Sequence, residues 1–325
     1  MKLLKLAGIA IFCAAPIVAS AQGVTVLKLG DVGAPGSLLS AAADEFASQA
    51  NAKLAGRVKI EVYGSSQLGG DKEMLQKLKL GTIDMVEPST VMSSVADIFG
   101  VFEMPYLVKD REHMKRIEKE LFWSKFEPAV EKKGYKILAV WENGYRQITN
   151  NKHPINTPAD LKGIKLRVPN GKWRVEMFKL YGANPSPMKF SEVFTALQTG
   201  VMDGEENPLA QIWSGKFYEV QKYLSLTDHV YTPAYLVVST TRWAKLPADV
   251  RKILEDTAKQ TQAFVYKKAE HDDETLLAKM KAAGIKVNVA DKAAFVAASK
   301  PIYAEFEKEV PGAKEVIDRA MALRQ

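Results

Sequence analysis

Strand-like and helix-like segments alternate through the first quarter of the chain, and this alternation limits the fold more than any other feature. Residues 24–29, 58–62 and 83–86 have the apolar patterns of strands. Residues 37–50 and 71–80 lie between them and carry apolar side chains at helical spacing. Strands joined by helices in this way pair in parallel, with the helices on the faces of the sheet. The sequence therefore predicts an α/β fold that begins with a β-α-β-α-β unit.

A second group of elements begins near Gly144. Residues 144–150 and 164–168 have strand patterns, and a long amphipathic helix is expected to start near Glu206. Pro247 can start a helix that extends past thirty residues to Gly284. Such a helix is about 50 Å long at 1.5 Å per residue, which is long enough to bridge two domains. We expect residues 22–143 and 233–272 to form domain I, and residues 144–232 and 273–325 to form domain II.

The N-terminus has the pattern of a secretory signal peptide. Lys2 and Lys5 precede an apolar run over residues 6–18, and Ala-Ser-Ala follows at residues 19–21. The run is shorter than the roughly 18 residues of a spanning helix. We therefore expect residues 1–21 to be removed, which leaves a soluble protein outside the cytoplasm. Cys13, the only cysteine, is lost with them, so the mature protein can form no disulfide.

Charge and motifs exclude several classes of function. The formal charge of +7 falls to +5 without Lys2 and Lys5, and the remaining cations are mixed with acids, which argues against a nucleic-acid partner. The four histidines lack metal-ligand spacing, so we expect neither a metal nor a cofactor. The chain has no nucleophile elbow, no phosphate loop and no dinucleotide fingerprint. We therefore expect no enzymatic activity.

A set of hydrogen-bond donors suggests an anion-binding site. Arg167 alternates with Ile164, Leu166 and Val168, so it leaves its strand on the side opposite the apolar trio. Pro169 ends that strand and places Arg167 near its carboxyl end, where open α/β sheets bind ligands. The planar guanidinium matches the two oxygens of a carboxylate.

Two further residues could join that site. Arg146 is expected in another strand, and Asn207 precedes Pro208 at the expected start of the long helix, where free N–H groups favour an anion. Spacing alone nevertheless favours surface or ion-paired roles for the arginines. Glu87 and Ser89 follow the third strand, where they could face a cleft or form a solvated turn.

Several longer segments resemble one protein family. They are QLGG (67–70), GTID (81–84), LKGIKLRVP (161–169), GANP (182–185), EVFTALQTG (192–200), DGEENP (203–208) and KFYEV (216–220). Together they are similar to the solute-binding proteins of TRAP transporters, the DctP family, including its sialic-acid-binding members. The resemblance covers essentially the whole mature chain.

The resemblance implies a two-domain periplasmic binding protein with a mixed sheet in each domain and an interdomain cleft. Such a protein closes on a small organic acid and delivers it to the membrane permease subunits of a TRAP transporter. We expect this protein to act in the periplasm as a monomer.

The resemblance also implies roles for individual residues. Arg167 would hold the ligand carboxylate with two hydrogen bonds, Arg146 would support it, and Asn207 would donate to it. Phe190 occupies a position that packs on the ligand, and Asp71 an acidic position that accepts from ligand hydroxyls in the sialic-acid binders.

Departures from the sialic-acid binders leave the ligand open. Where those proteins place a glutamate, this chain has Ser89, with Glu87 two residues earlier, and Trp173 adds bulk near the arginine strand. The acidic side chains favour a hydroxylated acid such as a sugar acid. Trp173 and Phe190 leave an aromatic acid possible, and a dicarboxylic acid is a further alternative. Less favoured alternatives are an exported enzyme and a sensor partner that acts on an organic acid.

Overall fold

The structure is a computed structural model and describes residues 24–325. The predicted signal peptide, residues 1–21, lies outside the described residues. Within the described part, no helix is both long enough and apolar enough to cross a membrane.

The predicted β-α-β-α-β unit is present. Strand β1 (Thr25–Gly30) pairs in parallel with β2 (Val58–Tyr63) and with β3 (Met85–Val86). Helices α1 (Leu38–Leu54) and α2 (Asp71–Leu80) connect these strands. The carboxyl ends of β1 and β3 therefore lie side by side, next to the start of α2.

Two long strands connect the two halves of the molecule. Strand β4 (Tyr135–Asn150) has 16 residues and includes the predicted strand at residues 144–150 in its second half. It pairs antiparallel with β9 (Tyr231–Ser239), which in turn pairs antiparallel with β3. Their register shifts between Glu142 and Gly144, where Gly144 has φ 120°, a conformation that side chains disfavour. The halves are thus joined by hydrogen-bonded strands.

The remaining strands extend this sheet beyond β4. They are β5 (Lys165–Val168), β6 (Asn184–Pro187), β7 (Gly204–Pro208), β8 (Tyr223–Leu226) and β10 (Lys286–Val289). The main path runs in the order β2-β1-β3-β9-β4-β7-β5-β6, while β8 pairs with both β4 and β10. We call the part around β1, β2 and β3 the first lobe and the part around β5, β6 and β7 the second lobe. Each lobe contains parallel and antiparallel pairs, as predicted.

The other helices cover the sheet and close its ends. The α-helices are α3 (Arg111–Ile117), α4 (Glu127–Glu131), α5 (Lys172–Leu180), α6 (Phe190–Gln198), α7 (Leu209–Ser214), α8 (Thr240–Lys245), α9 (Ala248–Ala282), α10 (Lys292–Ala298), α11 (Lys300–Glu309) and α12 (Ala313–Ala322). The 3₁₀ helices are η1 (Thr90–Ser94), η2 (Asp97–Glu103), η4 (Pro158–Leu161) and η5 (Phe217–Glu219), and η3 (Glu118–Phe126) is a π-helix.

The prediction of a long helix from Glu206 is wrong. Residues 204–208 form β7, which is completely buried between β4 and β5, so burial on both faces hides its strand character in the sequence. Helix α7 has six residues and ends at Gly215, after which Lys216 takes a left-handed conformation with φ 56°. Asn207 is therefore a strand residue and does not start a helix.

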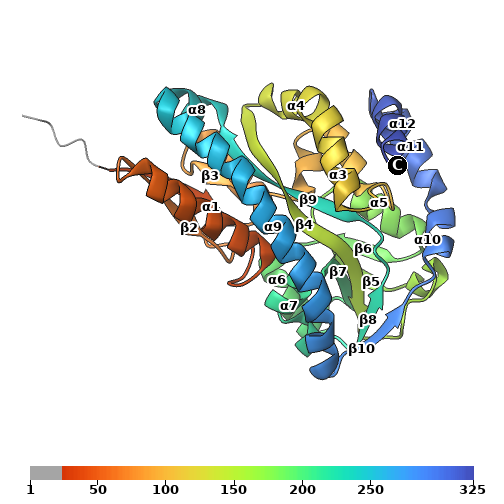
Figure 1. Ribbon diagram of the computed structural model, residues 1–325. Coiled ribbons are helices and arrows are strands. Elements are labelled where there is room, and N and C mark those ends of the chain that lie inside the picture. Colours follow the sequence, from red (N-terminus) through yellow and green to blue (C-terminus); the bar gives the residue numbers. More distant parts are fainter. Residues whose placement is uncertain (1–23) are drawn as a thin grey trace, which may run out of the picture.

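The expected long helix after Pro247 is confirmed. Helix α9 has 35 residues, which corresponds to about 53 Å. It packs against α1 in the first lobe, along β4, and against α7 near its far end. Figure 1 shows α9 crossing the molecule diagonally beside α1 and β4. One helix thus supports both lobes.

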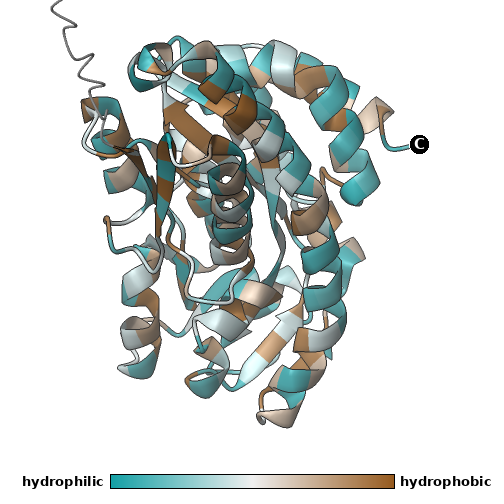
Figure 2. Ribbon diagram, turned by 60° about the vertical axis from the view of Figure 1, so that its left-hand side comes forward, coloured by the Kyte–Doolittle hydropathy of each residue, from teal (hydrophilic) through white to brown (hydrophobic). Residues whose placement is uncertain are grey.

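A cluster of phenylalanines lies in the core beside β9. Phe99, Phe102, Phe122 and Phe126 are buried and pack with one another at centroid distances of 4.9 to 6.4 Å. Phe99 and Phe122 also contact Tyr235 of β9, at 5.4 and 5.6 Å. Figure 2 shows hydrophobic colours concentrated on the interior strands, whereas the outer helices are largely hydrophilic. These rings fix the helical segment 97–126 on one face of β9.

The C-terminal helix α12 contacts α3, which lies within the predicted domain I, although residues 273–325 were expected in domain II. The His113 ring Nε2 is 2.7 Å from the carbonyl oxygen of Ala320, and Arg116 Nε donates to the carbonyl of Leu323 at 2.7 Å. The domain boundaries themselves stay a prediction.

Two carboxyl groups are buried where β1 and β3 end. Asp31 Oδ1 accepts from the backbone N–H of Gly33 at 2.7 Å, whereas Oδ2 and both carboxyl oxygens of Glu87 have no partner among the described residues. Burial is the main cause that raises the pKa of Asp31 to about 7 and the pKa of Glu87 well above its usual value. Folding therefore favours the protonated form of each carboxyl group.

Asp31→Asn tests this burial. The raised pKa of Asp31 means that the folded protein binds this proton more tightly than the unfolded chain does. The stabilisation of the folded state by this proton is therefore fully present below pH about 3.8 and is lost as the pH rises through about 7. We expect the unfolding free energy of the parent to fall over this window, by up to about 1.4 kcal/mol per pH unit from this group. Asp31→Asn should flatten the slope in urea unfolding curves.

Asp318→Asn, at an exposed position on α12, serves as the control and should leave the slope unchanged. Equal slopes for the parent and Asp31→Asn would contradict a buried, protonated Asp31.

Candidate functional site

A cavity of about 410 Å³ lies between the two lobes. The first lobe contributes the start of α2 and the segment after β3, and the second lobe contributes the ends of β5, β6 and β7. Polar and charged side chains on its wall are Asp71, Lys72, Glu73, Gln76, Ser89, Thr90, Asn143, Arg146, Arg167, Asn170, Lys189, Glu192, Asn207 and Gln211. The described residues contain no group of three or more metal-ligating side chains.

Arg167 of β5 reaches this cavity from the second lobe. Leu166 and Val168 on either side are fully buried in the core, so the two-residue period of the strand turns Arg167 the other way. Burial lowers the pKa of Arg167 to about 10, with Glu205 opposing the shift, so the guanidinium remains charged at neutral pH.

The backbone next to β6 fixes the orientation of that guanidinium. Arg167 Nε and Nη2 donate to the carbonyl oxygen of Met188 at 3.1 and 2.7 Å. Met188 is held in turn by its own N–H, which donates to the carbonyl of Val168 at 3.1 Å. Both bonds use the same edge of the guanidinium. The other edge, formed by Nη1 and Nη2, is left for a planar acceptor such as a carboxylate.

Arg146 of β4 lies in a buried ion-pair network centred on Glu206. Arg146 donates from Nε and Nη2 to the Glu206 carboxylate at 2.5 and 3.1 Å, and Arg174 Nη1 donates to Glu206 Oε2 at 2.7 Å. The ring of His229 is 3.0 Å from Glu206 Oε2. Although burial alone would raise it, Arg146 and Arg174 hold the pKa of Glu206 well below its usual value. Arg146 is therefore already paired with an anion.

The amide of Asn207 is oriented by its neighbours. Its Oδ1 accepts from Arg146 Nη2 at 3.0 Å, and its Nδ2 donates to Glu205 Oε2 at 2.5 Å. Glu205 also accepts from the hydroxyl of Thr149 at 2.9 Å. Burial raises the pKa of Glu205 to about 7, opposed by Asn207 and Arg167. The network fixes which end of the Asn207 amide is the donor.

Three other predicted site residues lie on the cavity wall. Asp71 is the first residue of α2, and burial raises its pKa to about 6 against the opposing charge of Arg167. Phe190 is the first residue of α6, and its ring lies 5.5 Å from that of Phe217. Ser89 donates to the carbonyl of Pro233 at 2.7 Å, so its hydroxyl hydrogen is already used.

Glu87 and Trp173 do not line this cavity, which corrects their assignment to the site. Glu87 turns into the first lobe beside Asp31, where its carboxyl is completely buried. Trp173 packs edge-on against Phe306 of α11, with 4.8 Å between centroids, and closely approaches Gly100. Apolar packing between α5, α11 and η2 thus accounts for Trp173.

Gln211 and Asn143 are two of the wall residues that were not predicted from the sequence. Gln211 Nε2 donates to Asn143 Oδ1 at 3.2 Å, and Asn143 Nδ2 donates to the Ser89 hydroxyl at 3.2 Å. In this series of hydrogen bonds, Gln211 Oε1 remains buried without a partner among the described residues. The sequence offered no reliable indication of Gln211, because Asn207 lies in β7 and Gln211 in α7. Asn143 gives none, because only the fold brings β4 beside η1.

Comparison with known proteins places this site in a family. Residues 29–309 match the family described as bacterial extracellular solute-binding protein, family 7, or DctP. The chain belongs to this family of TRAP transporter solute-binding proteins. DctP-family members are binding proteins and not enzymes, and they work with membrane permease components. The predicted family and fold class are thereby confirmed.

Two relatives and one solved structure illustrate the similarity. The 2,3-diketo-L-gulonate-binding periplasmic protein of Escherichia coli (strain K12) is 34% identical over 279 residues, 85% of each chain. The sialic acid-binding periplasmic protein of Vibrio cholerae is 35% identical over 295 residues, 90% of this chain and 91% of the relative. A TRAP solute-binding protein from Polaromonas sp., bound to D-erythronate, has a TM-score of 0.89 and 34% identity, covering 93% of this chain and 99% of that one.

Glu206→Gln tests the buried network. The substitution removes the anion that neutralises Arg146 and Arg174, which leaves buried charge uncompensated and costs about 3–5 kcal/mol of unfolding free energy. Urea unfolding at neutral pH measures the loss.

The control is Glu309→Gln, which breaks an exposed pair with Lys172 and should cost less than about 1 kcal/mol. Similar losses in both variants would contradict a structural role for Glu206.

Proposed function

We propose that this protein captures one hydroxylated monocarboxylic acid, such as a sugar acid, in the cavity between its lobes. It releases the acid in the periplasm to the permease of a TRAP transporter. The observation that carries the proposal is the geometry of Arg167. Its guanidinium is buried, one edge is held by the carbonyl of Met188, and it belongs to the cavity wall. The remaining edge can donate two parallel hydrogen bonds to a ligand carboxylate.

Charge pairing gives Arg146 and Arg167 different roles. Arg146 is neutralised by Glu206, so its contribution to the ligand is to orient Asn207 and to supply positive potential. Two of the carboxyl groups whose charge acts on Arg167, those of Glu205 and Asp71, have raised pKa values and make no hydrogen bond to it. Arg167 is therefore the cation that gains most from an incoming carboxylate.

Hydrogen-bond acceptors on the wall favour a ligand with hydroxyl groups. Gln211 Oε1 is buried and has no partner within residues 24–325, and Asp71 presents carboxyl oxygens. Leaving such groups unpaired in a closed cleft would cost roughly 1–3 kcal/mol each, which a ligand hydroxyl removes. With Trp173 in the core, Phe190 is the aromatic ring that remains for an aromatic acid. Among the relatives, the named ligands diketogulonate, sialic acid and D-erythronate are hydroxylated monocarboxylic acids, whereas one solved structure holds succinate.

Ligand capture requires the cleft to open and close. We propose domains at residues 22–143 with 233–272 and at residues 144–232 with 273–325, and a hinge where β4 and β9 shift register near Asn143 and Thr232. Helix α12, in the second of these domains, contacts His113 and Arg116 of the first, so these contacts cross the proposed boundary. A signal peptide at residues 1–21 would direct export.

Arg167→Lys tests the carboxylate contact. Lysine keeps the charge but cannot make two parallel hydrogen bonds, and each such bond is worth roughly 1.5–3 kcal/mol. We expect a loss of affinity on the order of a hundredfold or more, measured by titration calorimetry, with little change in melting temperature.

Arg146→Lys should show the reverse pattern, a lower melting temperature and a smaller loss of affinity, because it weakens the pairing with Glu206. Lys162→Met, at an exposed position, is the neutral control. Binding within a few-fold of the parent in Arg167→Lys would overturn the proposed contact.

A thermal-shift screen tests the ligand class. The panel is D-erythronate, 2,3-diketo-L-gulonate, sialic acid, succinate and benzoate. We expect a hydroxylated monocarboxylic acid to raise the melting temperature most, since a ligand at a hundred times its dissociation constant adds about 2.7 kcal/mol of stability. A shift with succinate or benzoate alone would reverse the assignment.

A further inference from the structure

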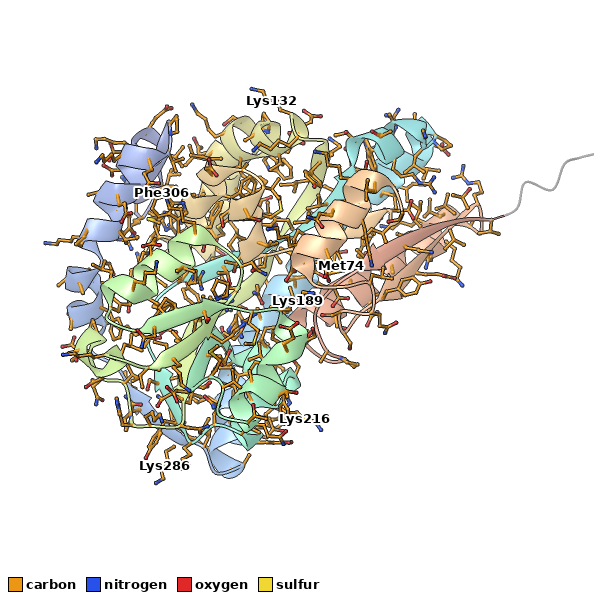
Figure 3. The ribbon with its side chains drawn as sticks, turned by 180° about the vertical axis from the view of Figure 1, so that it is seen from behind. Met74, Lys132, Lys189, Lys216, Lys286 and Phe306 are labelled. Carbon is orange, nitrogen blue, oxygen red and sulfur yellow. The ribbon has the colours of Figure 1, made fainter. Side chains whose placement is uncertain are left out.

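Two charged side chains meet across the mouth of the cavity. Lys189, between β6 and α6 in the second lobe, donates from Nζ to Glu73 Oε1 of α2 in the first lobe at 2.6 Å. Figure 3 shows Lys189 close to α2, near the labelled Met74. Both side chains are nearly half exposed, so the pair lies at the rim and not in the ligand-binding interior.

The backbones of the lobes also approach each other here. Gly70 caps α2 and faces the stem of Lys189. A Cβ atom at residue 70 would lie 3.3 Å from Lys189 Cγ and 3.7 Å from Lys189 Cβ. Glu73 is held in place because its Oε2 accepts from the backbone N–H of Gly70 at 2.9 Å. The ion pair therefore rests on a close apolar contact with a preoriented carboxylate.

Lys189 lies in the segment that also holds the ligand contacts. The preceding residue, Met188, supplies the carbonyl that orients Arg167, and the next residue, Phe190, lines the cavity. On the other side, Glu73 is two residues from Asp71. A movement that separates Lys189 from Glu73 therefore also separates the two walls of the cavity.

We propose that Gly70, Glu73 and Lys189 form a latch that holds the two lobes together and sets how long the cleft stays closed. Within the latch, Lys189 acts by positioning the second lobe against α2 of the first lobe. The effect on ligand lifetime rests on the proposed function, whereas the effect on closure does not. Because the ion pair is exposed, it stabilises closure only modestly and weakens with salt. A modest latch suits a protein that must release its ligand.

A cross-link tests whether the lobes meet at this point. In a Cys13→Ser background the chain has no cysteine, so Gly70→Cys with Lys189→Cys provides the only pair. The distance of 3.7 Å between the Cβ positions lies in the range of natural disulfides. Mild oxidation should give an intramolecular disulfide, seen by mass spectrometry, in the double variant and in neither single variant. Absence of that disulfide would overturn the latch.

A second experiment tests the ion pair without any ligand. Spin labels at Leu80→Cys and Val201→Cys, both exposed positions in opposite lobes, report the ratio of closed to open molecules. Glu73→Gln and Lys189→Met should each lower this ratio about two- to five-fold, and the double variant no further. The exchanged pair, Glu73→Lys with Lys189→Glu, should restore part of it, because a lysine at residue 73 cannot accept from the Gly70 N–H, and 1 M NaCl should abolish the differences.

Lys79→Met, an exposed lysine on α2, controls for the loss of a positive charge. Equal ratios of closed to open molecules in the parent and all variants would overturn the latch. This includes the case in which every ligand-free protein is open. With D-erythronate as the probe, the dissociation rate should rise by the same factor in each single variant. If no acid binds the parent, the proposed function fails, while the ligand-free ratios still decide the latch.

Discussion

The buried pairing of Glu206 with Arg146 and Arg174 is the interaction on which the site depends. Each partner comes from a different element, namely β7, β4 and α5, and the His229 ring adds a contact from the segment before β9. Isolated charges of this kind are costly to bury in a protein interior, and their pairing offsets that cost. It also fixes the Asn207 amide, whereas Arg167 donates hydrogen bonds to the carbonyl of Met188 and to no carboxylate among the described residues.

The sequence predicts most of the architecture. The alternation in residues 24–86 and the length of the helix after Pro247 depend on local patterns, which the structure reproduces. Strand β7 and the short helix α7 were not predictable in this way. Central burial removes the two-residue period from β7, and the stop at Gly215 and Lys216 looks like an ordinary pause in a helical stripe.

The site was predictable in part, for similar reasons. The apolar neighbours of Arg167 showed that it leaves its strand on the other side. Glu87 and Trp173 looked like site residues because strand ends and aromatic residues often are, but only tertiary packing decides that one faces Asp31 and the other Phe306. Gln211 and Asn143 become neighbours through contacts between distant elements, which no local pattern encodes.

The connection between the lobes limits how they can move. β4 and β9 are paired on both sides of the irregular register at Glu142 and Gly144, and α9 runs alongside β4. Two bonded strands resist shear and independent twisting, since either motion would break several backbone hydrogen bonds at once. Bending at the irregular register costs far less. The proposed opening would thereby be reduced to nearly one degree of freedom, so a ligand that contacts both lobes would control the relative orientation of the whole outer surface.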